Sequence, residues 1–248
     1  MNRGIFKKNI IIFTGAGVSA ESGIQTFRNS DGLWENHRIE DVATPSGFVL
    51  NPQLVWDFYK SRHDQLSEVG PNAAHYAISA FQKMFEFSDE YNVIVITQNV
   101  DRLHHESGSV GIIELHGNLH DVKCSYCDYI DDSREFWDEV DIPKCPECGE
   151  NLRPNIVWFF EPLDENDVKD AMTFAKNCSD IIVIGTSCGV YPAFSIVERA
   201  HLYGAKVYEC NLDQINTKFK NYEFVGGNSS ETVPKLLSTI YLEKTYNL

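Results

Sequence analysis

Polar side chains follow several apolar runs in the sequence, at the point where each run ends. Gln98, Asn99 and Asp101 come directly after the β-branched run VIVIT, and His116 follows the short run IIEL. A surface loop explains any one of them taken singly. Because ligands bind outside the carboxyl ends of parallel strands, we expect them together to face a common ligand. Histidine has the natural pKa of a general base, so His116 is the candidate catalytic residue.

A glycine-rich segment, GAGVSA, follows the first apolar run and fits the pattern G-x-G-x-x-G/A. Glycines there let the backbone turn tightly and approach a pyrophosphate at a helix N-terminus, although a plain strand-to-helix turn is the alternative. The long loop that follows favours a ligand, because such loops are uncommon unless functional. The dinucleotide-binding residues predicted here are Gly15, Ala16, Gly17, Ser19, Ala20, Phe27, Arg28 and Trp34.

Four of the seven cysteines form two C-x2-C pairs, which are Cys124 with Cys127 and Cys145 with Cys148. Four thiolates from two such knuckles, in a segment with few apolar residues, indicate a zinc site, and four buried free thiols are the alternative. Because four cysteines leave no open coordination position, this zinc is expected to be structural. We expect the remaining cysteines, Cys178, Cys188 and Cys210, to be core or loop thiols.

Short, continuously apolar runs alternate with helical patterns along the chain, which indicates a parallel sheet covered on both faces. Strands are expected at 9–14, 93–97, 112–115, 156–160, 180–186 and 206–210, and helices at 166–177 and 192–203. A helical insertion at 51–87 and the cysteine-bearing segment at 120–152 interrupt the alternation. We therefore predict an α/β protein whose doubly wound domain comprises 1–50, 88–119 and 153–248.

The charge of the chain excludes some functions. With 21 basic and 36 acidic residues among 248, the formal net charge is −15. Non-specific nucleic-acid binding needs a basic surface, so we expect no nucleic-acid partner, whereas lysine-rich protein partners are compatible with this charge. No run approaches a membrane span or a signal peptide. We therefore expect a cytoplasmic protein without a membrane partner, and a monomer.

Seven motifs, in order and spacing, resemble the sirtuins, the NAD-dependent protein lysine deacylases. They are GAGVSAESGIQTFR, TQNVD, the HG of ELHGN, the two C-x2-C pairs, RPNIVWFFE, GTSCGVYPA and NLD. The likeness covers about residues 9–240 and is nearest to the class that includes many bacterial sirtuins and the mitochondrial desuccinylase. It implies a Rossmann-like large domain, a small four-cysteine zinc-binding domain at 120–152, and NAD between them.

The resemblance also implies roles for particular residues. Gln98, Asn99 and Asp101 resemble the family's nicotinamide and ribose contacts. Contacts to the adenosine end are implied for Gly185, Thr186, Ser187, Asn211, Leu212, Asp213 and Ser229. In the implied reaction the acyl oxygen of a modified lysine displaces nicotinamide, and His116 then deprotonates a ribose hydroxyl. Water finally releases lysine and acyl-ADP-ribose, so NAD is a consumed co-substrate.

The expected helix at 51–68 refines the substrate. Tyr59 and Arg62 are three residues apart and so share a face, although a surface arginine beside a half-buried tyrosine is an equal alternative from sequence alone. The desuccinylase class that this chain resembles binds an acidic acyl group with the same Y-x-x-R pair, and Ala43 resembles the small residue that widens its pocket. Because a guanidinium binds a carboxylate through two parallel hydrogen bonds, we predict removal of succinyl and malonyl groups, with succinyl-lysine preferred over acetyl-lysine by about one to two orders of magnitude.

One motif departs from the family pattern. The segment that resembles the substrate-peptide strand, with Val157 and Phe159 as expected contacts, carries Phe160 where relatives usually have glycine, and Asn155 is a milder departure. Backbone pairing needs no particular side chain, so peptide preference is affected more than catalysis.

Three alternatives have less support. A deacetylase without acidic-acyl preference would share every motif except the use made of Tyr59 and Arg62. An NAD-linked dehydrogenase would share the glycine loop, but the acidic residue expected about 20 positions later is matched only loosely, by Glu40 and Asp41. A zinc ribbon that serves only for interaction leaves the polar strand ends unexplained. We expect His104 and His105 to be structural.

Overall fold

A parallel sheet forms the larger part of the fold in the computed structural model, which describes residues 7–26, 33–34, 37–132, 134–215 and 219–246. Its strands are ordered β11-β10-β9-β1-β4-β5, and every neighbouring pair is parallel. Their bounds are β1 Lys8–Thr14, β4 Tyr91–Thr97, β5 Ile113–Glu114, β9 Cys178–Ile184, β10 Lys206–Asn211 and β11 Tyr222–Gly226. The chain proceeds from β1 to β4 on one side and later to β9 on the other, so the strand order reverses beside β1. Ligands bind at such reversals in open parallel sheets.

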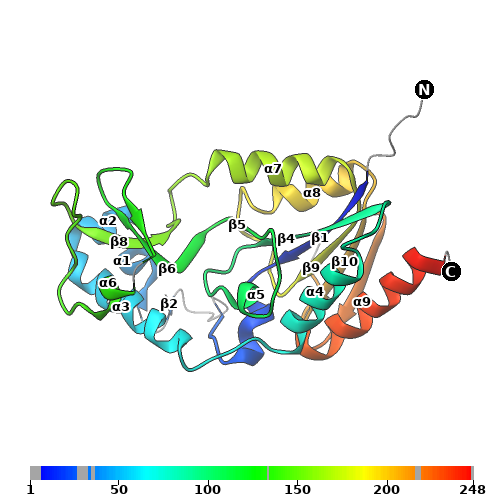
Figure 1. Ribbon diagram of the computed structural model, residues 1–248, viewed down its shortest axis with the longest axis horizontal. Helices are drawn as coiled ribbons and strands as arrows, with labels where there is room; N and C mark the ends of the chain where they lie inside the picture. Colours follow the sequence, from blue (N-terminus) through cyan, green and yellow to red (C-terminus); the bar gives the residue numbers. More distant parts are fainter. Residues whose placement is uncertain (1–6, 27–32, 35–36, 133, 216–218, 247–248) are drawn as a thin grey trace.

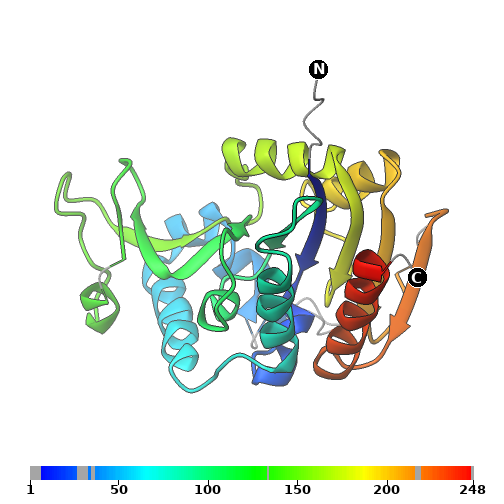
Figure 2. The same cartoon turned by 45° about the vertical axis from the view of Figure 1, so that its right-hand side comes forward.

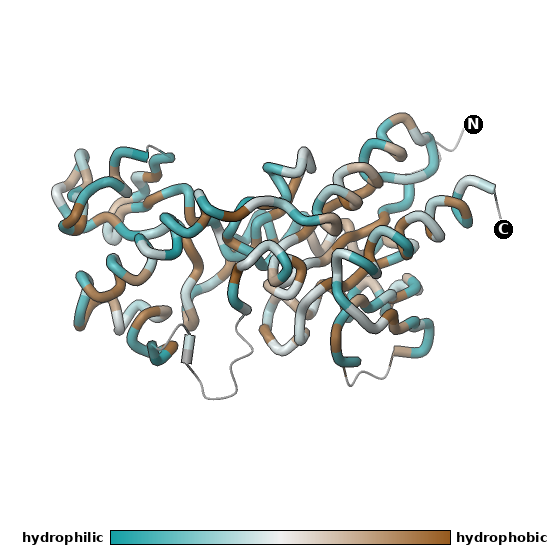
Figure 3. Tube along the Cα trace, turned by 90° about the horizontal axis from the view of Figure 1, so that it is seen from below, coloured by the Kyte–Doolittle hydropathy of each residue, from teal (hydrophilic) through white to brown (hydrophobic). Residues whose placement is uncertain are grey.

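Helices cover both faces of this sheet (Figure 1, Figure 2). The pair on one face is α4 (Ala73–Met84) with α9 (Ser229–Tyr246), and the pair on the other is α7 (Glu165–Lys176) with α8 (Ser195–Leu202). Side chains alternate along a strand, so in β1 Ile10 and Ile12 pack toward the first pair while Ile11 packs toward the second. Figure 3 shows hydrophobic and hydrophilic residues interspersed in short stretches along the chain trace. The predicted fold class, a doubly wound α/β sheet, is confirmed.

A smaller lobe lies beside the carboxyl ends of the parallel strands (Figure 1). Its antiparallel sheet has the order β7-β6-β8. The elements of the smaller lobe are β6 Gly117–Cys124, β7 Ile130–Asp131, β8 Leu152–Ile156, α1 Ile39–Val42, α2 Pro45–Leu50, α3 Pro52–Leu66 and α6 Glu135–Asp138. Trp56 of α3 stacks on Trp137 of α6 with ring centroids 5.0 Å apart, so α3 and the cysteine-bearing segment share one core.

Local sequence explains where α3 begins. The Asn51 side chain accepts a hydrogen bond from the Leu54 N–H, and Pro52 occupies the first helical turn, as expected for that pair of residues. The remaining short elements are the 3-10 helix η1 Ala16–Ser22, β2 Leu33–Trp34, β3 His37–Arg38 and α5 Leu103–Glu106. Within the described ranges, every helix is too short or too polar to cross a bilayer.

One expected strand is wrong. The run IVWFF at 156–160 was predicted to join the parallel sheet, but the strand there is β8, which ends at Ile156 and pairs antiparallel with β6. The four residues after Ile156 are apolar because they line a cavity or lie at its mouth, and not because they fill a sheet interior. A short apolar run does not by itself distinguish these environments.

Candidate active site

A cavity of about 460 Å³ lies between the carboxyl ends of the parallel strands and the smaller lobe. One side is formed by the loops after β1, β4 and β9, where the strand order reverses, and the other by α3 and the segment after β8. Small-molecule sites commonly have volumes of about 300–1,000 Å³. The predicted site residues that line the cavity are Gly15, Ala16, Gly17, Trp34, Ala43, Tyr59, Arg62, Gln98, Asn99, Asp101, His116, Val157, Phe159, Gly185, Thr186 and Ser187.

The glycine-rich loop packs directly on the turn after β9. A Cβ atom on Gly17 would lie 2.6 Å from the Gly185 Cα, and one on Gly15 would lie 2.7 Å from the Thr186 Cβ. The N–H groups of Gly15 and Gly17 donate to the carbonyls of Ile184 and Gly185 at 3.0 and 2.7 Å. The glycines are therefore required for the two loops to pack against each other where both line the cavity, as expected for the tight first turn of a dinucleotide-binding fold.

Three buried side chains, Ser19, Asn99 and Asp101, form a hydrogen-bonded trio at the polar end of the cavity. Ser19 Oγ donates to Asp101 Oδ2 at 2.7 Å and accepts from Asn99 Nδ2 at 3.0 Å. Burial raises the pKa of Asp101, and hydrogen bonds from Ser19, the Leu103 N–H and Asn99 oppose that rise. Ser19 is fully buried and does not line the cavity, so it contributes by holding Asn99 and Asp101 in place.

His116 lies at the cavity between β5 and β6, and its ring is fixed by a backbone contact. Its Nδ1 is 3.0 Å from the carbonyl oxygen of Gln98. A carbonyl only accepts, so Nδ1 carries the proton and Nε2 keeps a lone pair. Burial lowers the pKa of His116 below its usual value, and the Gln98 carbonyl partly offsets this. A neutral imidazole with an unprotonated Nε2 is suited to general-base chemistry near pH 7.

Two further buried histidines lie behind the trio. His75, which the sequence analysis did not identify, accepts the Asn72 N–H at Nδ1 and directs Nε2 toward Ser19 Oγ at 3.4 Å. The His104 Nε2 is 2.9 Å from Thr14 Oγ1, and its ring lies 4.9 Å from that of His75. Burial lowers the pKa of His75 to about 4 and that of His104 to about 3, so both are neutral at physiological pH.

The opposite side of the cavity, here called the α3 wall, consists of Trp34, Ala43, Tyr59 and Arg62. Tyr59 is buried, and its ring packs against Trp34 with centroids 5.8 Å apart. Arg62 is half-buried one helical turn further along α3. Ala43 is also buried and has the smallest side chain in the wall. The α3 wall therefore combines a phenol and a guanidinium in an otherwise apolar surface.

The segment after β8 is held by residues of the site itself. The Val157 N–H donates to the His116 carbonyl at 2.9 Å, and the Phe159 N–H donates to the Ala43 carbonyl at 3.0 Å. Val157 and Phe159 thus connect the candidate base to the α3 wall.

Phe160 has an unusual backbone conformation for a residue with a side chain. Residues 158–161 form a turn in which the Glu161 N–H donates to the Trp158 carbonyl at 3.1 Å. Phe160 is the third residue of this turn, and its φ is +73°. A positive φ at this position is characteristic of type II turns and normally requires glycine. The Phe160 side chain is 91% exposed at the cavity mouth.

Side chains at the ends of β10 and β4 support the loop after β9. Asn211 Nδ2 donates to the Thr186 carbonyl at 2.8 Å, and Gln98 Nε2 donates to Thr186 Oγ1 at 3.1 Å. The predicted residues outside the cavity lining are Ser19, Ala20, Asn211, Leu212, Asp213 and Ser229. Phe27 and Arg28 lie outside the residues that the structure describes.

Several cavity residues were given no role from the sequence, although some lie within the family motifs. Those not identified from sequence include Ile24, Gln25, Thr26, Ile39, Gln65, Leu66, Val100, Leu119, Trp158 and Leu163. Trp158, for example, contacts Tyr59 across 99 positions of sequence. The family motif RPNIVWFFE and the expected strand at 156–160 both include Trp158, but neither pattern indicates its contact with Tyr59.

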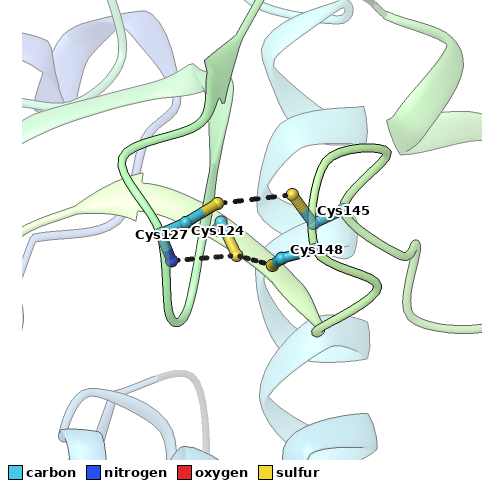
Figure 4. A group of neighbouring side chains, drawn as sticks. All are labelled: Cys124, Cys127, Cys145 and Cys148. Carbon is cyan, nitrogen blue, oxygen red and sulfur yellow. Dashed lines mark hydrogen bonds between the residues drawn. The ribbon is translucent and has the colours of Figure 1, made fainter.

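The four predicted zinc ligands come together in the smaller lobe (Figure 4). The Sγ atoms of Cys124, Cys127, Cys145 and Cys148 all lie within 4.8 Å of one another. Cys124 and Cys148 are 3.5 Å apart at sulfur, and Cys127 and Cys145 are 3.6 Å apart. Tetrahedral zinc with Zn–S bonds of about 2.3 Å needs sulfurs separated by about 3.8 Å, so this donor set fits one zinc ion with a closed coordination shell.

Comparisons with known proteins agree on one family. The model of the Sir2 family matches residues 15–192. The NAD-dependent protein deacylase of Thermococcus sibiricus is 44% identical over 92% of this chain and 90% of its own length, and that of Pasteurella multocida is 43% identical over 92% and 96%. A solved Sir2 homologue in complex with NAD has a TM-score of 0.84 at 37% identity, covering 94% of this chain and 89% of its own. A Sir2 protein bound to a myristoylated histone peptide has a TM-score of 0.73 at 32% identity, covering 97% and 93%.

Proposed function

The chain belongs to the Sir2 family and is an NAD-dependent protein deacylase, and from this premise we propose that it removes succinyl and malonyl groups from protein lysines in preference to acetyl groups. Its partners are then proteins that carry acyl-lysine, and its products are nicotinamide and O-acyl-ADP-ribose. The observation that carries the acyl preference is the presence of Tyr59 and Arg62 on one face of α3, in the same cavity as His116.

Charge in the cavity supports an acidic acyl group. Among the described residues of the cavity lining, Arg62 is the only one with a formal positive charge. Its guanidinium carbon lies 5.0 Å from the centroid of the Phe58 ring, so the cation rests against an apolar surface that lowers its access to water. A carboxylate at the end of an acyl chain would gain charge-assisted hydrogen bonds there, worth roughly 1.5–3 kcal/mol each before desolvation. We therefore expect a selectivity of about 10- to 100-fold for succinyl over acetyl.

The geometry around His116 supports the catalytic roles that we propose. When bound, NAD supplies a ribose carbon that accepts the acyl oxygen as nicotinamide departs. We assign to the Nε2 atom of His116 the removal of a proton from a hydroxyl group in the cavity, because Nδ1 is committed to Gln98. We assign to Asn99 and Asp101 the polar contacts at the nicotinamide end, because Ser19 holds both side chains. The apolar part of the lining would limit the entry of competing water.

The acidic-acyl preference is tested with one peptide that carries either succinyl-lysine or acetyl-lysine. We expect NAD-dependent nicotinamide release from both forms, with a kcat/KM for the succinyl form that is about tenfold or more above that for the acetyl form. Replacing Arg62 with methionine should lower the succinyl value by about 10- to 100-fold and the acetyl value by less than about threefold, because only the succinyl group presents a carboxylate.

A matched control distinguishes loss of this contact from general damage. Arg199 is on α8 and is not among the residues that line the cavity, so Arg199→Met should leave both kcat/KM values and their ratio unchanged. Comparable wild-type rates on the two peptides would retain a deacylase but remove the acidic-acyl preference. Equal losses on both peptides in Arg62→Met would remove Arg62 from acyl recognition.

A further inference from the structure

Trp158 is a buried residue of the cavity lining, next to Tyr59 of the α3 wall, and is held on several sides. It is 3% exposed. The guanidinium carbon of Arg153 lies over its ring at 3.4 Å from the centroid, and the Phe48 ring packs against it at 5.4 Å. The Tyr59 ring lies nearly parallel to it, with centroids 6.2 Å apart and an interplanar angle of 27°. The position of the indole is therefore fixed by packing and by a buried cation.

A partly buried ion pair fixes Arg153 in turn. Arg153 Nη1 and Nη2 donate to the two carboxylate oxygens of Glu161 at 2.6 and 2.8 Å, and Nη2 also donates to the Ile156 carbonyl at 2.7 Å. Glu161 Oε2 accepts the backbone N–H of Trp158 at 2.8 Å. Burial alone would raise the pKa of Glu161, but the hydrogen bonds from Arg153 and from Trp158 lower it, so the carboxylate stays charged. The Arg153–Glu161 ion pair therefore holds both the turn at 158–161 and the Trp158 indole.

The outer edge of the indole contacts the phenol of the α3 wall. Trp158 Nε1 lies 3.1 Å from the Tyr59 hydroxyl oxygen. An indole N–H only donates, so the phenol oxygen is the acceptor and its single proton must point away from Trp158. Among the described residues, none accepts that proton, and Tyr59 lines the cavity. Burial raises the pKa of Tyr59, so the proton is retained at physiological pH.

We propose that Trp158 is a positioning residue for acyl selection: its indole N–H occupies the phenol oxygen of Tyr59 and thereby directs the Tyr59 proton into the cavity, toward the carboxylate of an acidic acyl group. This inference rests on the proposed acidic-acyl preference and adds a residue that does not touch the acyl group's carboxylate. Without the indole N–H, the phenol can rotate its proton away from the cavity, and the hydrogen bond to the carboxylate is lost for part of the time.

The test compares wild type with Trp158→Phe, Tyr59→Phe and the double variant on the succinyl and acetyl peptides. The measured quantity is the ratio of the two kcat/KM values, which cancels losses common to both substrates. We expect Trp158→Phe to lower the ratio about three- to tenfold and Tyr59→Phe to lower it at least as much, which are effects expected for one charge-assisted hydrogen bond. In the Tyr59→Phe background, Trp158→Phe should change the ratio by less than about twofold, because its effect passes through the phenol.

Trp56→Phe is a matched control for the loss of a buried indole. Trp56 is on the same helix as Tyr59, is fully buried, and its Nε1 atom has no hydrogen-bond partner among the described residues. We expect this variant to lower the melting temperature without changing the ratio. If Trp158→Phe does not fold, benzothienylalanine at position 158 retains the shape of the indole while replacing its N–H by sulfur, and the same ratio is measured.

The outcomes separate this inference from the one it rests on. A wild type without preference for the succinyl peptide overturns both. A succinyl preference that Tyr59→Phe reduces but the change at position 158 does not would overturn the role of Trp158 alone. Independent losses that multiply in the double variant would also overturn it, because Trp158 would then act without Tyr59.

Discussion

Replacing Phe160 with glycine is expected to make the protein more stable, although the substitution removes an aromatic ring. Phe160 adopts a φ of +73° as the third residue of its turn. A side chain in this left-handed region costs about 1–2 kcal/mol, whereas glycine adopts it without steric cost. The ring is 91% exposed, so little burial is lost with it.

The unfolded state limits how much stability the Phe160→Gly substitution gains. Glycine loses more conformational freedom on folding than other residues, and this cost offsets about 0.5–1 kcal/mol of the backbone strain that the substitution removes. The net stabilisation is therefore about 0.5–1 kcal/mol. For a chain of 248 residues, an unfolding entropy of roughly 2.1 cal/mol/K per residue gives about 0.5 kcal/mol/K, so the melting temperature should rise by about 1–2 °C.

Urea unfolding and scanning calorimetry on a series of substitutions at position 160 provide the assay. Phe160→Ala removes the ring but keeps the backbone cost, so it should stay within about 0.5 kcal/mol of wild type. Phe160→Asn should be intermediate, because asparagine tolerates the left-handed region better than other residues with a side chain. A glycine variant no more stable than the alanine variant would refute the backbone argument, since the two differ chiefly in their tolerance of positive φ.

Two further predictions concern the base and the zinc site. His116→Ala should lower kcat by at least about 100-fold with the circular dichroism spectrum unchanged, and full activity would remove the base assignment. Because burial lowers the pKa of His116 and the neutral form is the base, wild-type kcat/KM should fall only as pH drops below His116's usual 6.5. Metal analysis should find one zinc ion per chain. Removal of the zinc by a chelator should lower the melting temperature and abolish turnover. The control variant Cys178→Ser, which changes a cysteine outside the cluster, should keep the zinc.

The features that sequence predicted correctly are those set by local patterns. The run NIIIFT before the glycine loop is buried on both faces as β1, and Asn51 with Pro52 begins α3 as its residue types require. The paired cysteines were predicted to meet because two-residue spacing forms a knuckle, and their sulfurs do lie together. In each case the residue types and spacing within a short segment carry the signal, even where the contacting residues, such as the two cysteine pairs, are 18 and 24 positions apart.

The errors and omissions have a common physical origin in contacts between distant residues. The run at 156–160 was assigned to the parallel sheet because its apolar side chains suit a sheet interior, but pairing of β8 with β6 ends the strand at Ile156. The hydrogen bond from Ser19 to Asp101, 82 residues away, was not predicted, because it depends on how η1 packs against the loop after β4. Trp158 gave no signal of its contact with Tyr59, which depends on how α3 meets the turn after β8.

The zinc cluster and the α3 wall are structurally connected, although the metal site performs no chemistry in our proposal. Cys124 ends β6, and its pairing partner in β8 is Leu152, the neighbour of Arg153. Arg153 holds the indole of Trp158, which contacts Tyr59. Loss of zinc would free the end of β6 and remove support from β8, so the geometry of the α3 wall would loosen along with the fold of the smaller lobe. A structural metal can in this way contribute to acyl selection through strand pairing alone.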